Sequence, residues 1–122
     1  MRAGVRVLLV DDDPEQLAAL ALLLEDRGLT VETARSGPEA LGRIAQSAPD
    51  VLVVDAAMPE IGGLEVIRRA HLIHPSLPAV LLTAYSRDTV NNALAAVRAA
   101  YLAKPVDLGA LFDVLARAVP AR

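Results

Sequence analysis

Val51-Leu52-Val53-Val54-Asp55 is the stretch that decides the fold, because four consecutive apolar residues end on a carboxylate. An apolar run this short predicts a strand that is buried on both faces of a parallel sheet. Three more runs end on a polar residue in the same way: Val7–Val10 before Asp11, Ala79–Leu82 before Thr83, and Tyr101–Ala103 before Lys104. Parallel strands place their carboxyl ends along one edge, where open α/β folds bind ligands. We therefore expect these polar side chains to share one pocket.

The composition limits the classes of protein that remain. A chain of 122 residues that is 54% apolar and 2% aromatic is suited to one domain with an aliphatic core. Because cysteine is absent, disulfides, thiolate nucleophiles and zinc–thiolate sites are excluded. The net charge is −3 and the basic residues are scattered, so we expect no nucleic-acid binding. No apolar stretch reaches the ~20 residues of a membrane span and no signal peptide is evident, so we expect a cytoplasmic protein without membrane contact.

Strand and helix patterns alternate along the chain. Asp13-Pro14, the capping box from Ser36 to Glu39, and Asp107 each predict the start of a helix. Five βα units predict an α/β fold in a single domain over 1–122, with a doubly wound five-stranded parallel sheet. The strand order is not encoded in the pattern, and the flavodoxin-like (βα)5 order 2-1-3-4-5 is the common choice. The residues expected on the buried faces of the helices are Leu17, Leu20, Ala21, Leu24, Leu41, Ile44, Ala45, Leu64, Ile67, Leu72, Val90, Leu94, Val97, Leu111, Val114, Leu115 and Ala118.

The acidic residues at the strand ends favour a divalent cation. Burying a carboxylate without compensation costs several kcal/mol, so the adjacent carboxylates Asp11 and Asp12 need a compensating positive charge. Mg²⁺, which takes six oxygen ligands, would supply that charge. Asp13 is better explained as a helix cap. Asp55 adds a third carboxylate, and with the metal present one of its oxygens can bind metal while the other attacks phosphorus.

Two further strand ends complete the expected pocket. Lys104 is placed to offset charge on a transferring phosphoryl group, although a lone lysine is more often a solvated surface charge. Thr83 is able to donate a hydroxyl hydrogen bond to a phosphoryl oxygen, and a cap on the following helix explains it equally well in isolation.

The whole chain resembles the receiver domain of two-component response regulators, the chemotaxis-regulator-like fold. The resemblance is carried by four segments in order: Val10–Asp13, Val54–Pro59, Leu82–Ala84 and Tyr101–Pro105. It implies that Asp55 accepts a phosphoryl group from the phosphohistidine of a sensor histidine kinase or a phosphotransfer protein. It implies a catalytic set of Asp55, Lys104 and Thr83. It also implies that Mg²⁺, with Mn²⁺ as a substitute, is held by Asp11, Asp12, Asp55 and the backbone carbonyl of Ala57.

The resemblance also implies a switch. Thr83 moves toward the phosphoryl group and Tyr101 changes rotamer, and the face of the fourth helix, fifth strand and fifth helix then controls a protein target or attached output domain. A phosphorylation-dependent dimer is left open. The expected chemistry is the chain's own phosphotransfer and autodephosphorylation. The autodephosphorylation is expected to be slow, because the side chains of Ala57 and Tyr85 offer little to position an attacking water molecule. No independent substrate turnover is expected.

Two departures from the family pattern stand out. Gly62-Gly63 replaces an Asp-Gly pair, which we interpret as loop variation. Val97–Ala100 lacks the usual Gly and Asp and predicts a changed fourth helix and output face.

Two other functions remain as alternatives. One is a receiver-like interaction module that works without phosphorylation. The other is a small phosphohydrolase in which Asp11 and Asp13 form an Asp-x-Asp nucleophile pair.

Overall fold

The apolar runs form one five-stranded parallel sheet in the order β2-β1-β3-β4-β5, which confirms the predicted fold class and strand order. The structure, a computed structural model, describes residues 3–119, so the ends of the predicted domain 1–122 lie outside the described residues. The elements are β1 Arg6–Val10, α1 Pro14–Asp26, β2 Thr30–Ala34, α2 Gly37–Gln46, β3 Val51–Asp55, α3 Gly63–Ile73, β4 Ala79–Thr83, α4 Arg87–Ala95, β5 Ala100–Ala103 and α5 Leu108–Ala118.

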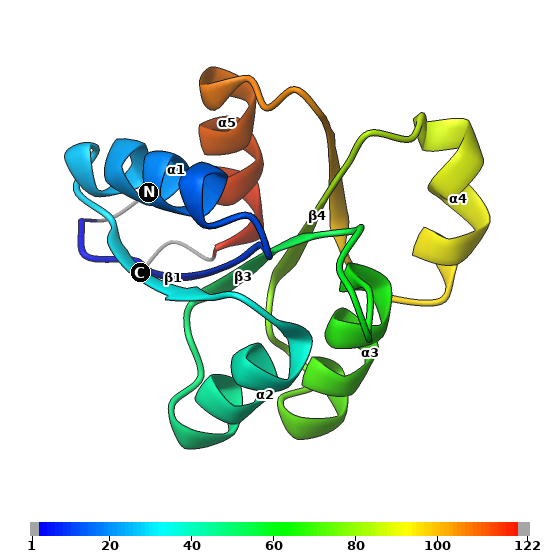
Figure 1. The fold of residues 1–122 in the computed structure, drawn as a ribbon. Helices are drawn as coiled ribbons and strands as arrows, with labels where there is room; N and C mark the ends of the chain where they lie inside the picture. The colour runs from blue at the N-terminus through cyan, green and yellow to red at the C-terminus, as the bar shows by residue number, and fades with distance from the viewer. Residues whose placement is uncertain (1–2, 120–122) are drawn as a thin grey trace.

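Helices cover both faces of the sheet (Figure 1). α1 and α5 pack on one face of the sheet, and α2, α3 and α4 lie on the opposite side. Successive residues of a strand point to opposite faces, so Val53 packs in the cluster under α1 and α5 while Val54 packs under α2 and α3. Both faces of β3 are thus buried, which explains why its sequence is continuously apolar.

The predicted helix starts are confirmed by side-chain caps. The Asp13 carboxylate accepts the backbone N–H of Glu15 at 3.0 Å. The Ser36 hydroxyl accepts that of Glu39 at 3.2 Å, and Asp107 accepts that of Ala110 at 2.9 Å. Each contact satisfies an N–H group that has no partner within its own helix.

Two of the predicted buried residues are wrong. Ala45 is exposed, because α2 buries the stripe Gly37, Ala40 and Ile44, and position 45 lies beyond its edge. Leu72 is 73% exposed. The buried face of α3 is set by Val66, Ile67 and Ala70, and a residue two positions after Ala70 turns about 200° away from it.

The departure from the family pattern at Val97–Ala100 lies between the end of α4 and the first residue of β5. α4 forms over Arg87–Ala95, so Val97, predicted on its buried face, lies two residues beyond its end and is partly buried. Ser86 caps α4, and Val90 and Leu94 are its buried side chains among the described residues. In Figure 1 α4 stands at the right of the view, away from the labelled strands. None of the helices described has the length and apolar character needed to cross a bilayer.

Candidate functional site

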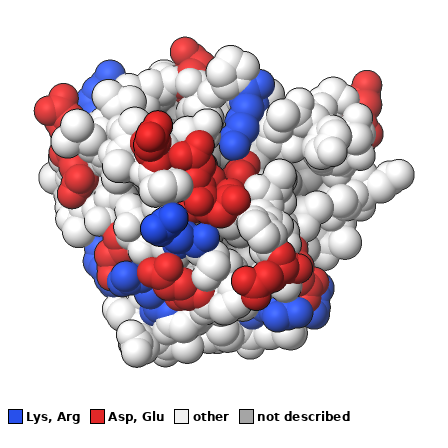
Figure 2. Space-filling view, viewed as in Figure 1, with Lys and Arg blue, Asp and Glu red and all other residues white. Residues whose placement is uncertain are grey.

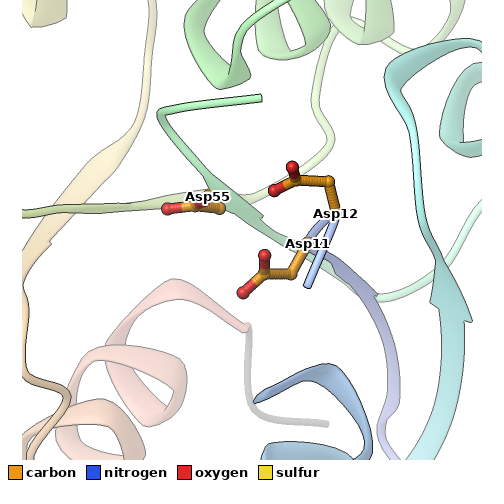
Figure 3. A group of neighbouring side chains, drawn as sticks. All are labelled: Asp11, Asp12 and Asp55. Carbon is orange, nitrogen blue, oxygen red and sulfur yellow. The ribbon is translucent and has the colours of Figure 1, made fainter. Parts of the chain in front are cut away.

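The ends of β1 and β3 bring three carboxylates together. Val10 pairs with Val54 in the parallel register, so Asp11 and Asp55 stand next to each other at the sheet edge. One carboxylate oxygen from each of Asp11, Asp12 and Asp55 lies within 4.8 Å of the other two. Figure 3 shows the three side chains pointing to the same side. Asp11 and Asp55 are buried, at 9% and 5% exposure, while Asp12 is exposed.

The site holds an excess of negative charge. Burial raises the pKa of the Asp11 carboxyl above its ordinary value, and the charges of Asp55 and Asp12 act in the same direction. The backbone N–H of Asp13, which donates to Asp11 at 3.0 Å, and the Lys104 ammonium oppose that rise in pKa. Figure 2 shows acidic side chains gathered in the middle of this face of the molecule. Converging carboxylate oxygens with uncompensated charge form a donor set that fits Mg²⁺.

Lys104 lies against the buried carboxylate. Its Nζ atom is 2.7 Å from Oδ1 of Asp55, and its side chain is 27% exposed. The Lys104 backbone N–H donates to the carbonyl oxygen of Thr83 at 2.8 Å, which extends the β4–β5 ladder by one residue. The lysine is therefore placed at the site by the sheet, and it does not occupy the solvated surface position that its residue type alone suggests.

The two predicted switch residues both contact the backbone of Tyr85. Thr83 is buried at 2% exposure, and its Oγ1 accepts the backbone N–H of Tyr85 at 3.1 Å. The Tyr101 hydroxyl donates to the backbone carbonyl of Tyr85 at 2.6 Å. The backbone of Tyr85 thus contacts both Thr83 and Tyr101, while its own side chain is 62% exposed.

The loop after Asp55 approaches α3 closely. The N–H of Gly63 donates to the carbonyl of Ala56 at 3.0 Å, and a Cβ atom on Gly63 would lie 2.5 Å from the Asp55 carbonyl oxygen. Gly63 therefore begins α3 in contact with the backbone of the predicted phosphoacceptor. The interpretation of Gly62, in place of the family's Asp, as loop variation stays a prediction. Ala57 is exposed and brings no polar side chain to the site. The role of its carbonyl stays a prediction.

Sequence reasoning missed two features of the site. It did not find that the Tyr85 backbone links Thr83 to Tyr101, and no sequence signal marks a backbone contact of this kind. It also missed the packing role of Gly63, for which the glycine pair was an available signal of close backbone approach.

A parallel (βα)5 sheet with carboxylates, a buried hydroxyl and a paired lysine at its carboxyl edge defines the class of receiver-type α/β proteins. The response regulator receiver domain family matches residues 7–116, and the chain belongs to this family. Receiver domains act as phosphoacceptors in signalling, bind Mg²⁺ and interact with histidine kinases and output domains.

Individual relatives agree with this assignment. The response regulator MprA of Mycobacterium ulcerans is 44% identical over 117 residues, which cover 93% of this chain and 48% of MprA. The chain thus spans about half the length of that relative. The solved chemotaxis protein CheY4 of Vibrio cholerae is 30% identical with a TM-score of 0.89, covering 96% of this chain and 100% of CheY4. The response regulator TrrA of Thermotoga maritima, solved in complex with Mg²⁺ and BeF, is 30% identical with a TM-score of 0.84, covering 93% of this chain and 98% of TrrA.

Adding Mg²⁺ is expected to raise the thermal unfolding temperature, because the carboxylates converge only in the folded chain. Binding at about one hundred times the dissociation constant stabilises a fold by about 2.7 kcal/mol. Asp12→Asn should weaken the effect, and Asp113→Asn, an exposed acid on α5, should leave it intact. The measurement is calorimetry with Mg²⁺ and with a chelator. An unfolding temperature that does not respond to Mg²⁺ in the wild type would contradict the metal site.

Proposed function

We propose that the chain is a single receiver domain, 1–122, in which Asp55 accepts a phosphoryl group from a phosphohistidine. The observation that carries this proposal is the buried Asp55 carboxylate, with Lys104 at 2.7 Å and two further carboxylates beside it. The test is incubation with acetyl phosphate, with and without Mg²⁺, followed by the intact mass of the wild type and of Asp55→Asn. A phosphoryl adduct that needs both Mg²⁺ and Asp55 is the expected result.

In this mechanism each residue has a separate task. A carboxylate oxygen of Asp55 attacks phosphorus, and the bond from phosphorus to the histidine nitrogen breaks. Lys104 stabilises the negative charge on the transferred group from its position at the end of β5. The residues that would hold Mg²⁺ are Asp11, Asp12, Asp55 and the carbonyl of Ala57, and the ion would offset charge on the phosphoryl oxygens. The likeness to TrrA, which was solved with Mg²⁺ and BeF, supports this choice of metal.

The contacts of Tyr85 supply a path for the switch. In the structure Thr83 uses its hydroxyl oxygen as an acceptor, which leaves the hydroxyl proton for a phosphoryl oxygen. When Thr83 turns toward that group, the N–H of Tyr85 loses its acceptor and the β4–α4 loop can rearrange. Since the Tyr101 hydroxyl is bound to the carbonyl of the same residue, Tyr85, its rotamer changes with the loop. A new anion at Asp55 thereby shifts the population of the α4–β5–α5 face, which would control a protein target or an output domain.

The structure gives the two rival functions less support. A module that works without phosphate has no use for the close Asp55–Lys104 pair. A phosphohydrolase with an Asp11–Asp13 nucleophile pair would use the carboxylate of Asp13 in its reaction, whereas here Oδ1 of Asp13 caps a helix. That carboxylate accepts the N–H groups of Glu15 and Gln16 at the start of α1.

The aspartyl phosphate is expected to hydrolyse slowly. Ala57 has no polar side-chain atom and Tyr85 is mostly exposed, so neither positions a water molecule as an acid or amide would. Ala57→Asn should accelerate phosphoryl loss about tenfold. This factor is smaller than the rate enhancement that a well-positioned general acid or base contributes. The measurement is the decay of the adduct after the donor is removed. Ala116→Asn, at an exposed position on α5, serves as the control, and an unchanged decay in Ala57→Asn would refute the explanation.

A further inference from the structure

A groove of about 560 Å³ runs between α1 and the β5–α5 loop. Aliphatic side chains and a proline make up most of its wall: Ala19, Leu20, Leu82, Ala84, Pro105 and Val106. The amide side chain of Gln16 is a polar group on the same wall. A groove with this lining favours an apolar occupant of small-molecule size.

The groove is continuous with the phosphoacceptor site. Asp11 and Lys104 both line it, and Nζ of Lys104 is 2.7 Å from the Asp55 carboxylate. An occupant therefore has a cationic contact beside the reactive carboxylate and an apolar wall beyond it. This charge pattern is complementary to a molecule with a phosphate head and an apolar body.

We propose that this groove is a leaving-group subsite that gives preference to phosphodonors with an apolar ring, such as an aromatic acyl phosphate. The proposal rests on the phosphoacceptor function of Asp55 set out above. With benzoyl phosphate, a carboxylate oxygen of Asp55 forms a bond to phosphorus, and the bond between phosphorus and the acyl oxygen breaks. The electron pair leaves with benzoate, so the step needs no proton and no further reactant.

The size of the leaving group should decide the rate. The methyl group of acetyl phosphate leaves most of the groove unfilled, whereas the ring of benzoyl phosphate covers apolar wall. Contacts of this kind in an apolar pocket discriminate by about tenfold or more. We expect benzoyl phosphate to label Asp55 about tenfold faster than acetyl phosphate, after each rate is divided by that donor's own rate of hydrolysis in buffer.

A pair of neighbouring alanines on α1 provides the test. Ala19 lines the groove, and Ala18 is exposed on the same helix and is not part of the groove wall. Ala19→Phe should fill the groove and lower the benzoyl-to-acetyl rate ratio about tenfold, and Ala18→Phe should keep the wild-type ratio. The subsite would be overturned if the two donors had equal corrected rates in the wild type, or if Ala19→Phe and Ala18→Phe had the same benzoyl-to-acetyl rate ratio. The groove would then be assigned as a contact for a protein side chain. Failure of both donors to label Asp55 would instead overturn the phosphoacceptor function.

A non-reactive pair of ligands separates binding from reactivity. Benzylphosphonate and methylphosphonate share the anionic head and differ in the ring. Benzylphosphonate should inhibit labelling by acetyl phosphate about tenfold more strongly than methylphosphonate, and Ala19→Phe should remove that difference. Equal inhibition by the two phosphonates in the wild type would count against the subsite even if the donors differ in rate.

Discussion

Asp55→Asn is expected to remove phosphoryl acceptance, with labelling by acetyl phosphate and Mg²⁺ falling by at least about a thousandfold. The amide of asparagine lacks the anionic oxygen that attacks phosphorus. The substitution also leaves Lys104 without its carboxylate partner at 2.7 Å. The measurement is intact mass after incubation with the donor, together with peptide mapping of the modified residue. Chelation of Mg²⁺ in the wild type should give a comparable loss, because the acidic cluster then opposes the approach of an anion.

Asp13→Asn is the matched control for this experiment. Asparagine preserves the capping oxygen that accepts the N–H groups at the start of α1, so the fold and the labelling should both persist. The same variants distinguish the phosphohydrolase. Steady turnover of a phosphomonoester that survives Asp55→Asn and disappears in Asp11→Asn would assign the chemistry to the β1 end and reject the receiver mechanism.

Gly63→Ala is expected to destabilise the fold by roughly 1–3 kcal/mol, the usual cost of forcing an extra methyl into a packed site. The added Cβ would lie 2.5 Å from the Asp55 carbonyl oxygen and 2.9 Å from a methyl group of Leu81. The backbone atom cannot move aside as a flexible side chain would. The start of α3 must shift instead, and the Asp55 backbone shifts with it. Labelling with acetyl phosphate should therefore fall together with the free energy of unfolding, which is measured by denaturant titration.

Gly42→Ala makes the same chemical change with the opposite expected sign. Gly42 lies inside α2, and a Cβ built there has no neighbour within 4 Å. Alanine reduces the backbone entropy lost on folding, so the fold should gain about 0.5–1 kcal/mol. If the two substitutions changed the free energy of unfolding equally, the close backbone approach at Gly63 would make no contribution to stability.

The sequence predicted the fold well because its signals were local and repeated. The apolar run Val51–Val54 is buried on both faces, as its continuous pattern required. Asp13, Ser36 and Asp107 cap their helices because a side-chain oxygen next to free N–H groups is decided within a few residues. The convergence of Asp11, Asp55 and Lys104 followed from strand direction, since parallel strands all end at one edge.

Features that depend on distant parts of the chain were harder to predict. Leu72 is apolar and on a helix, yet the angle at which α3 packs leaves it exposed. The backbone of Tyr85 gained its role from two partners, Thr83 and Tyr101, which meet it only once β4 and β5 are paired. The approach of Gly63 to Asp55 likewise needs the path of the whole β3–α3 loop.

The pairing of Tyr101 with Tyr85 has a practical consequence for spectroscopy. The chain contains two tyrosines and no tryptophan, so its intrinsic ultraviolet emission comes from this one corner of the molecule. A change in the hydrogen bond of the Tyr101 hydroxyl alters the surroundings of an emitting group without any attached dye. Native fluorescence is therefore a label-free, time-resolved signal for the conformational state next to β4 and β5.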